Sequence, residues 1–258
     1  MSGSATGSGS HVLYERSVAT VIASWDAVAR GGREAIVHRL PGVHAAVFPH
    51  EPERSVYNNA YLAFGLSNDG DRRAIDAAES VYAALGITSF ALWAHETDAG
   101  VRDTLEARGY GVAECTRAMG VHLSRAANDE AAVDVETGTW SDYLAFLEQW
   151  DVPPGLLAGV DEHAFRVRLV RNGGRPVAAS IAFDHDGDCG IFNVGTLEDA
   201  RGRGYGTAVT AAQLRDGRVR GCVTATLQST QMAERIYTGL GFQDLGRILE
   251  YRTGASSR

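Results

Sequence analysis

The chain has 258 residues, 45% of them hydrophobic, and a formal net charge of −8. This composition is typical of a globular protein with one large or two small domains, and the acidic balance argues against a general nucleic-acid binder, which would carry a basic surface. Every basic residue is arginine, which indicates a GC-rich, bacterial genome and leaves no lysine for a phosphate-binding loop of the P-loop type.

Cysteines and hydropathy indicate the compartment. Cys115, Cys189 and Cys222 are far apart in the chain, which predicts reduced thiols in a cytoplasmic protein and neither a disulfide framework nor a metal site. No apolar run reaches the ~18 residues of a membrane-spanning helix. The N-terminus is rich in Gly and Ser without the features of a signal peptide, and we expect a flexible tail over residues 1–14.

The first half of the chain is expected to alternate strands and helices. Apolar residues from Glu15 to Ala29 recur at helical spacing, and a glycine pair ends this helix. The later elements expected are strands at 35–40, 43–48 and 55–64, a helix at 74–85, a strand at 87–93, a helix at 99–108 and a strand at 110–123. These elements would form one lobe over 15–123, followed by a polar linker over 124–131.

The second half, residues 132–258, is expected to form another α/β lobe. It opens with an aromatic-rich helix that includes Trp140, Tyr143, Phe146 and Trp150. Further on, we expect a strand at 191–196, a turn made of glycine and arginine, a helix at 207–219, a strand at 222–227 and a helix at 232–240 that ends at Gly241.

The turn, Arg201-Gly202-Arg203-Gly204-Tyr205-Gly206, carries the strongest functional signal. Glycines let the backbone approach a phosphate, and the free amides and positive dipole end of a helix N-terminus point at it. The two arginines add charge and forked hydrogen bonding. The turn therefore predicts a bound pyrophosphate, and hence a nucleotide-containing cofactor.

Three glycine-rich loops could bind that pyrophosphate. A P-loop is excluded because its lysine is absent. A Rossmann fingerprint is disfavoured by the late position of the turn and by the arginine-rich stretch where an acidic residue should follow. The third pattern, R-x-x-G-x-G, is matched by Arg201, Gly204 and Gly206.

This third pattern resembles the coenzyme A pyrophosphate loop of the GNAT superfamily of N-acetyltransferases. The segment from Ala233 to Phe242 is similar to the A-x-x-x-Y-x-x-x-G-F block that closes a GNAT domain. Both motifs occur in the family's order, and the resemblance covers residues 133–252, about half of the chain. It implies the GNAT fold, an α/β class with a central mixed β-sheet flanked by helices.

The resemblance implies that acetyl-CoA, with no metal, lies between splayed parallel strands at 191–196 and 222–227. The backbone of Val194 and Thr196 would pair with pantetheine, and an amide near Val194 or Gly195 would polarise the thioester carbonyl. The cofactor-binding residues implied in this way are Asn193, Val194, Gly195, Thr196, Arg201, Gly202, Arg203, Gly204, Tyr205, Gly206, Thr207 and Ser229.

The implied reaction is direct attack of a primary amine on the thioester. Tyr237 stands where the family has its general acid, and a phenol with a pKa near 10 is protonated at neutral pH. The alternative is that Tyr237 packs the face of the last helix. No general base can be identified, since the candidates are better explained as solvated surface charges and the family often uses a water chain. The candidates are Glu148, Asp151, Asp161, Glu162 and His163.

The two halves also resemble each other. Asn58 and Asn193, Gly86 and Gly221, and Leu92 and Leu227 recur at a spacing of 135 positions. We interpret the chain as two tandem GNAT-like lobes. At that spacing the loop residues Arg201, Gly204 and Gly206 correspond to Leu66, Asp69 and Asp71, and Tyr237 corresponds to Leu105 when counted from the Gly-aromatic pair. The first lobe is thus expected to be degenerate and structural.

The leading hypothesis is an acetyl-CoA-dependent N-acetyltransferase acting on a small-molecule amine. The alternative is a non-catalytic CoA-binding sensor or partner-binding module, which would need neither Tyr237 nor all three loop glycines. Acceptor-binding residues are expected in a variable segment such as 150–162. We expect a monomer or homodimer that binds neither nucleic acid nor membrane.

Overall fold

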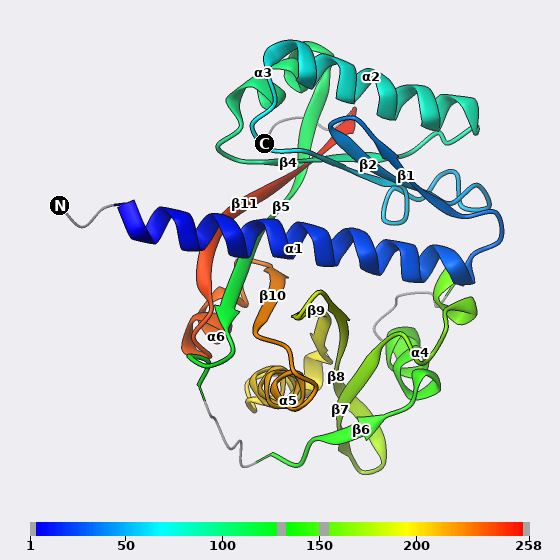
Figure 1. The fold of residues 1–258 in the computed structure, drawn as a ribbon. Helices are drawn as coiled ribbons and strands as arrows, with labels where there is room; N and C mark the ends of the chain where they lie inside the picture. Colours follow the sequence, from blue (N-terminus) through cyan, green and yellow to red (C-terminus); the bar gives the residue numbers. More distant parts are fainter. Residues whose placement is uncertain (1–3, 128–132, 150–154, 255–258) are drawn as a thin grey trace. The chain divides into compact units, whose positions relative to one another are not determined.

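The computed structural model describes residues 4–127, 133–149 and 155–254. The chain divides into two compact units. Unit 1 comprises residues 1–24 and 118–245, and unit 2 comprises residues 25–117 and 246–258. Both units contain β-strands flanked by helices, so the expected α/β class with mixed pairing is confirmed (Figure 1).

Unit 2 contains most of the first half of the chain. Its strands follow the order β1-β2-β3-β4-β11-β5, with β3 and β4 parallel and the end of β11 antiparallel to β4. The elements are β1 (Ile36–Leu40), β2 (Val43–Val47), β3 (Asn59–Leu62), α2 (Asn68–Ala84), β4 (Ala91–His95), α3 (Ala99–Ala107), β5 (Tyr110–His122) and the end of β11 (Gln243–Thr253).

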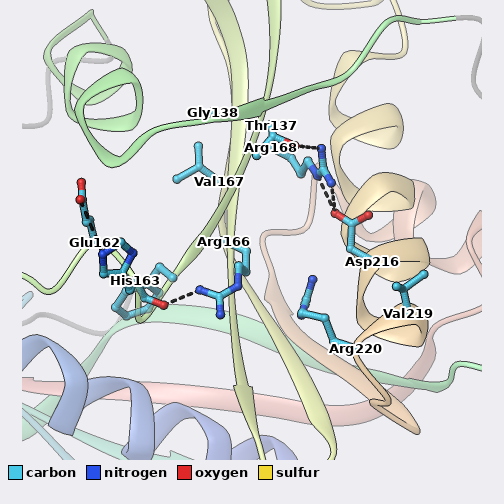
Figure 2. A pocket seen from close by; sticks show the side chains of 11 residues that line it. Thr137, Gly138, Glu162, His163, Arg166, Val167, Arg168, Asp216, Val219 and Arg220 are labelled. Atoms are coloured by element: carbon cyan, nitrogen blue, oxygen red, sulfur yellow. Dashed lines mark hydrogen bonds and ion pairs between the residues drawn. The ribbon is translucent and has the colours of Figure 1, made fainter.

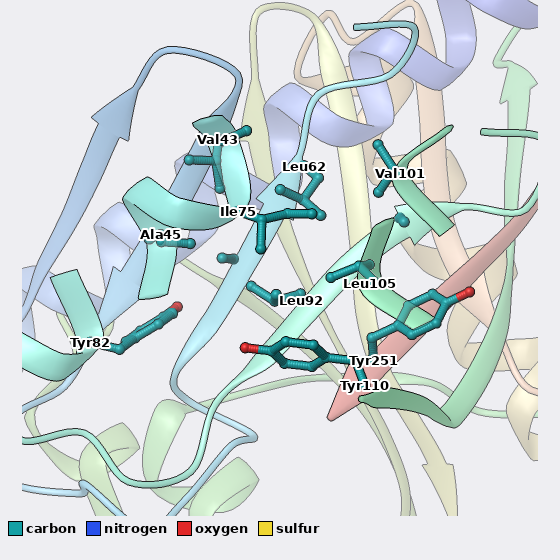
Figure 3. Packing of buried hydrophobic residues seen from close by; sticks show 14 of the residues in the cluster. Val43, Ala45, Leu62, Ile75, Tyr82, Leu92, Val101, Leu105, Tyr110 and Tyr251 are labelled. Carbon is teal, nitrogen blue, oxygen red and sulfur yellow. The ribbon is translucent and has the colours of Figure 1, made fainter. Parts of the chain in front are cut away.

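The apolar faces of α2 and α3 pack on this sheet (Figure 3). Ile75 and Tyr82 of α2 are fully buried against Leu92 of β4, and Leu105 of α3 belongs to the same cluster. Leu105, which the sequence repeat is expected to align with Tyr237, is therefore a core leucine, which packs and cannot donate a proton.

Unit 1 has its strands in the order β5-β10-β9-β8-β7-β6. Only β10 and β9 are parallel among the pairs from β10 to β6. Its elements are β6 (Glu136–Gly138), α4 (Trp140–Gln149), the 3₁₀ helix η1 (Gly155–Gly159), β7 (Arg166–Asn172), β8 (Arg175–His185), β9 (Asp188–Thr196), the 3₁₀ helix η2 (Glu198–Ala200), α5 (Tyr205–Val219), β10 (Thr224–Ser229) and α6 (Glu234–Gly239).

Helix α5 packs tightly on β8 and β9. Ala211 and Leu214 join a buried cluster with Cys189 and Ile191 of β9. Close approach requires a small residue at Gly217, where an added Cβ would lie 3.2 Å from the Cβ of Cys189. The backbone of α5 is thus packed closely against β9. The glycine-arginine turn connects these two elements, so their packing determines its position.

The expected chain divisions need correction. Helix α1 runs from Ser4 to Gly31, so residues 4–14 of the expected tail are helical. Burial explains the difference, because Leu13 and Tyr14 are buried in the core of unit 1 and offset the poor helix propensity of the Gly- and Ser-rich start. The expected lobe boundaries at 123 and 132 also differ from the observed division after residues 24, 117 and 245. Of the expected linker, residues 128–131 lie outside the described residues.

Other element boundaries differ less. The strand expected at 55–64 is shorter, at 59–62, and the helix expected at 74–85 begins earlier, at Asn68. The helix expected at 232–240 is reduced to Glu234–Gly239, whose N-cap position is Ala233 without a side-chain cap. Among the described residues, no helix is both long and apolar enough to cross a bilayer.

Candidate functional site

The parallel pairing of β9 with β10 stops partway along both strands. Partners run from Asp188 opposite Thr224 to Ile191 opposite Leu227. Strand β9 continues to Thr196 and remains paired with β8 on its other side, where Thr196 lies opposite Ala178. Residues 192–196 therefore have no partner on β10, and the two strands separate there. Backbone groups on such an edge require another partner, which an extended ligand can supply.

The closed end of this gap is held by a buried carboxylate. Asp188 is almost fully buried, and its oxygens accept hydrogen bonds from Thr224 (2.7 Å) and Thr226 (2.6 Å) of β10 and from Thr20 (2.8 Å) of α1. A buried carboxylate is tolerated when hydrogen bonds satisfy it. Asp188 thus joins the starts of β9 and β10, and the sequence analysis did not identify it.

Strand β9 carries a bulge inside the gap. Phe192 lies opposite Ile181, but Gly195 lies opposite Ala179, so β9 has one residue more than β8 between these pairs. Asn193, in the bulge, has a left-handed backbone with φ of 50°. Its side-chain Nδ2 donates a 2.7 Å hydrogen bond to the hydroxyl of Tyr143 on α4. The aromatic helix thereby contacts the strand expected to bind the cofactor.

The glycine-arginine turn follows β9 and η2 directly. Gly202 and Gly204 have φ of 76° and 79°, a conformation that strains other residues. Gly204 is the N-cap of α5, and within the described part of the chain no side chain caps the helix. The amides of Tyr205, Gly206 and Thr207 are therefore available to an anion.

The arginine side chains of the turn are exposed and contact only backbone carbonyls among the described residues. Arg201 Nε donates to the carbonyl of Thr196 (3.4 Å), and Arg203 Nη2 donates to that of Asp199 (3.5 Å). Neither forms an ion pair with a carboxylate in the described part of the chain. Their charges can therefore contact a bound anion.

Helix α6 lies beside this turn. An added Cβ at Gly206 would lie 3.7 Å from Oγ1 of Thr196 and 4.0 Å from Cδ1 of Ile236, so β9, the turn and α6 converge at Gly206. Tyr237, the next residue in α6, is 5% exposed and packs edge-on against Phe242. Val194 of β9 packs against the same apolar cluster.

The environment of Tyr237 determines its acidity. Burial raises the pKa of its hydroxyl to about 12. The hydroxyl has no hydrogen-bond partner among the described residues, yet it is not one of their fully buried, unpartnered polar atoms.

Ser229 is the last residue of β10 and is buried. Its hydroxyl donates to the carbonyl of Thr230 (2.8 Å). The hydroxyl of Ser229 therefore already donates its proton in a hydrogen bond within the protein. The other expected cofactor residues lie along β9 from Asn193 to Thr196 and in the segment from Arg201 to Thr207.

The candidate bases are dispersed. Asp151 lies outside the described residues, Glu148 is exposed on α4, and Asp161 accepts a hydrogen bond from the amide of His163. Glu162 and His163 line a hollow of about 430 Å³ that holds none of the expected cofactor residues (Figure 2). Its lining is Thr137, Gly138, Glu162, His163, Phe165, Arg166, Val167, Arg168, Asp216, Val219 and Arg220. No hydrogen bond or ion pair joins the described candidates, Glu148, Asp161, Glu162 and His163, to Tyr237.

The turn of unit 2 that was expected to correspond to the glycine-arginine turn has a different chemistry. Helix α2 is capped by Ser67, whose hydroxyl accepts from the amide of Gly70, and Asp69 and Asp71 occupy its first turn. If the two helix starts are aligned, Ser67 rather than Asp69 corresponds to Gly204, two positions from the expected register. Strand β3 extends only one residue, Leu62, beyond its last pair with β4. Unit 2 thus has a capped, acidic helix start and no comparable gap.

Comparisons with known proteins agree with this geometry. Residues 126–242 match the family model described as the acetyltransferase (GNAT) family. Among solved structures, a GCN5-related N-acetyltransferase from Kribbella flavida is similar, with a TM-score of 0.69 at 17% identity over 93% of this chain and 96% of that one. A GCN5-related N-acetyltransferase-like protein from Streptococcus suis gives 0.56 at 16% identity over 93% and 98%. No curated protein matches the sequence.

Proposed function

Residues 126–242 form a domain of the GNAT acetyltransferase family, and from this premise we propose that the protein transfers the acetyl group of acetyl-CoA to the primary amine of a small molecule. One observation carries the proposal. The gap beyond the Ile191–Leu227 pair leads directly to an uncapped helix start with two positive-φ glycines. An extended pantetheine and a pyrophosphate need these two features in this order.

The residues present fit coenzyme A. The amides from Arg203 to Thr207 would hold the pyrophosphate, because no side chain among the described residues caps the start of α5. The guanidinium groups of Arg201 and Arg203 would add charge-assisted hydrogen bonds. The backbone of β9 from Asn193 to Thr196 would pair with the pantetheine amides in place of the missing β10 partner.

Acetyl-CoA supplies an acyl group already activated as a thioester. In the proposed step the amine nitrogen forms a bond to the carbonyl carbon, the carbon–sulfur bond breaks, and the thiolate leaves. The amide of Val194 or Gly195 would donate to the carbonyl oxygen as negative charge develops on it. The proton lost by the amine passes to water.

Tyr237 is proposed as the group that donates to the departing sulfur. A phenol with a pKa of about 12 is a weaker acid than a thiol of about 8.5, so complete transfer to a free thiolate is uphill by about 3.5 pKa units. The hydroxyl therefore stabilises the sulfur by hydrogen bonding while the carbon–sulfur bond breaks, and solvent completes the protonation.

We also propose that unit 2 is a degenerate GNAT-like lobe with a structural role. Support comes from the shared element order, since β1-β2-β3-α2-β4-α3-β5 of the first half repeats as β7-β8-β9-α5-β10-α6-β11 in the second. The capped start of α2 and the core leucine at position 105 support loss of the binding and acid functions. Three unpaired cysteines support a reducing, cytoplasmic compartment.

The alternative is a CoA-binding sensor without catalysis. A thiol-release assay separates the two functions. The full chain is incubated with acetyl-CoA and a broad panel of primary amines, including amino acids, polyamines and aminoglycosides, and free CoA is titrated with a thiol reagent. The enzyme hypothesis expects amine-dependent release above the rate without protein. Tight CoA binding by calorimetry without release across the panel selects the sensor.

A further inference from the structure

A side chain from outside β9 forms a hydrogen bond with the bulge of this strand. Tyr143 is fully buried in α4, and its hydroxyl accepts the hydrogen bond from Nδ2 of Asn193 at 2.7 Å. Asn193 itself is exposed and is one of three non-glycine residues with positive φ in the described part of the chain. The two residues are 50 positions apart, so the contact is tertiary and not a product of local turn chemistry.

The direction of the Asn193 side chain shows that this contact depends on the bulge. Side chains of a regular strand alternate between the two faces of the sheet. Ile191 packs in the cluster of α5, so regular alternation would place Asn193 on the α5 face as well. Instead the side chain of Asn193 reaches α4. Trp140 of α4 packs on Phe165, which in turn packs on Phe183 of β8. Phe183 lies on the opposite face of β8 from Ala182, which belongs to the cluster with α5. The left-handed backbone at Asn193 makes this reversal possible.

The same bulge supplies the backbone that the proposed reaction uses. Neither Asn193 nor Val194 has a partner in the register with β8, and neither has one on β10. Left-handed backbone is costly for a residue with a Cβ and persists where the surroundings hold it in place. Among the described residues, the Tyr143 hydroxyl is the side-chain partner that Asn193 has for this purpose.

We propose that Tyr143 is a positioning residue for acyl transfer, whose hydroxyl holds Asn193 in the left-handed conformation and so directs the amides of Val194 and Gly195 at the thioester carbonyl. This inference rests on the proposed acetyltransferase function. Tyr143 contacts neither cofactor nor amine in this role, because it acts through the backbone of β9.

The competing explanation is that the hydroxyl only stabilises the packing of α4. The two explanations differ at Asn193. Glycine adopts positive φ without strain and has no side chain to fasten. If Tyr143 acts through the conformation of residue 193, a glycine at that position makes the hydroxyl dispensable for turnover. If the hydroxyl only stabilises packing, its removal lowers the thermal midpoint of unfolding and leaves the kcat of the folded enzyme unchanged.

The test is a double-mutant cycle with Tyr143→Phe, Asn193→Gly and the double variant. The rate of CoA release is measured with acetyl-CoA and the best amine of the panel, and the Kd of CoA, which lacks the acyl group, is measured by calorimetry. Tyr110→Phe is the matched control, since it removes a tyrosine hydroxyl bonded to Glu79 in unit 2.

We expect Tyr143→Phe to lower kcat by about 10- to 100-fold, because a small misplacement of a donor costs that much, while the Kd of CoA changes less than about twofold. Adding Tyr143→Phe to Asn193→Gly should change kcat less than about twofold from the value of Asn193→Gly alone. Tyr110→Phe should leave kcat at the wild-type value.

Two results would overturn the positioning role alone. One is an active wild-type protein whose kcat is unchanged by Tyr143→Phe. The other is a pair of losses that multiply in the double variant, which means that the hydroxyl does not act through residue 193. A wild-type protein that binds CoA but releases none from acetyl-CoA with any amine overturns the proposed enzyme function, and the positioning role with it.

Discussion

Leu227 and Ile191 are the last paired residues of the parallel strands β10 and β9, and beyond them the strands separate. The closed end is joined by Asp188 through the hydroxyls of Thr224 and Thr226. The open end leads to the glycine-arginine turn and to α6. This arrangement places a free strand edge, an uncapped helix start and a buried tyrosine around one gap within unit 1.

The role of Tyr237 is tested by Tyr237→Phe. The ring packs against Phe242 and the hydroxyl has no partner among the described residues, so the variant should fold normally. We expect kcat to fall by about 10- to 100-fold with the Kd of CoA within about twofold, since the hydroxyl acts only on the departing sulfur. An unchanged kcat at saturating acetyl-CoA and amine would remove Tyr237 from the mechanism.

The pH dependence of kcat follows from the burial of Tyr237. Burial raises the pKa of the hydroxyl to about 12, above the ordinary value near 10, so the phenol stays protonated to higher pH in the folded chain. Its contribution to stability is complete below pH ~10 and is lost as the pH rises towards ~12. We therefore expect no fall of kcat from this group between about pH 7 and pH 10.

Steady-state rates of wild type and Tyr237→Phe over that range check this expectation. A descending limb between about pH 8 and pH 10 that is present in the wild type and absent from the variant would show an ordinary or lowered pKa. That result would contradict the buried, protonated tyrosine described above.

A substitution at Gly206 should weaken ligand binding without destabilising the fold. Its φ is not positive, and an added Cβ would make ordinary contacts with Thr196 and Ile236. Gly206→Ala should therefore keep or raise the thermal midpoint, because alanine favours a helix by up to about 1 kcal/mol. The Kd of CoA should rise by tenfold or more, a loss of about 1.4 kcal/mol, because the methyl group would occupy space beside the pyrophosphate.

Gly9→Ala is the matched control for Gly206→Ala. Gly9 lies in α1 with open space around its Cβ position, so alanine there should leave the Kd of CoA unchanged. Calorimetry and thermal unfolding of both variants check the prediction. Unchanged CoA affinity in Gly206→Ala would place the pyrophosphate elsewhere.

Unit 2 carries a destabilising charge at Asp71. The residue is almost fully buried, and neither carboxylate oxygen has a hydrogen-bond partner among the described residues. Burial, and then the charge of Asp98, raise the pKa of this carboxyl. The folded chain therefore favours the protonated form, and stability falls as the pH rises through the raised pKa.

Asp71→Asn removes that charge. We expect the thermal midpoint to rise by about 2–4 °C at neutral pH and by less near pH 4, where the carboxyl is already partly protonated. Thermal unfolding of both proteins at the two pH values provides the measurement. A variant that is less stable at both would mean that the carboxylate has a stabilising role.

The sequence predicted the parts of the site that depend on local chemistry. The turn from Arg201 to Gly206 was located because glycine and arginine at a helix start have a specific physical use, and α5 begins within two residues of the expected position. The strands of the gap were also located, although β9 starts three residues earlier than expected and β10 is shifted by two residues.

Features that depend on tertiary contacts were missed. The bulge at Asn193 was not predicted, although asparagine inside a strand-like run is a signal, because it is depleted in strands and tolerates positive φ. The partner role of Tyr143 could not be read from the sequence, since the two residues are 50 positions apart. The start of α1 was missed because its burial, rather than its propensity, determines its structure.

The most direct test of the central claim is a calorimetric titration of CoA into the full chain. The site in unit 1 predicts one CoA per chain, with the affinity lowered at least about fivefold in Arg201→Gln because an exposed guanidinium then no longer contacts the pyrophosphate. Two sites per chain, or no detectable binding, would contradict the assignment of the gap in unit 1 as the single coenzyme A site.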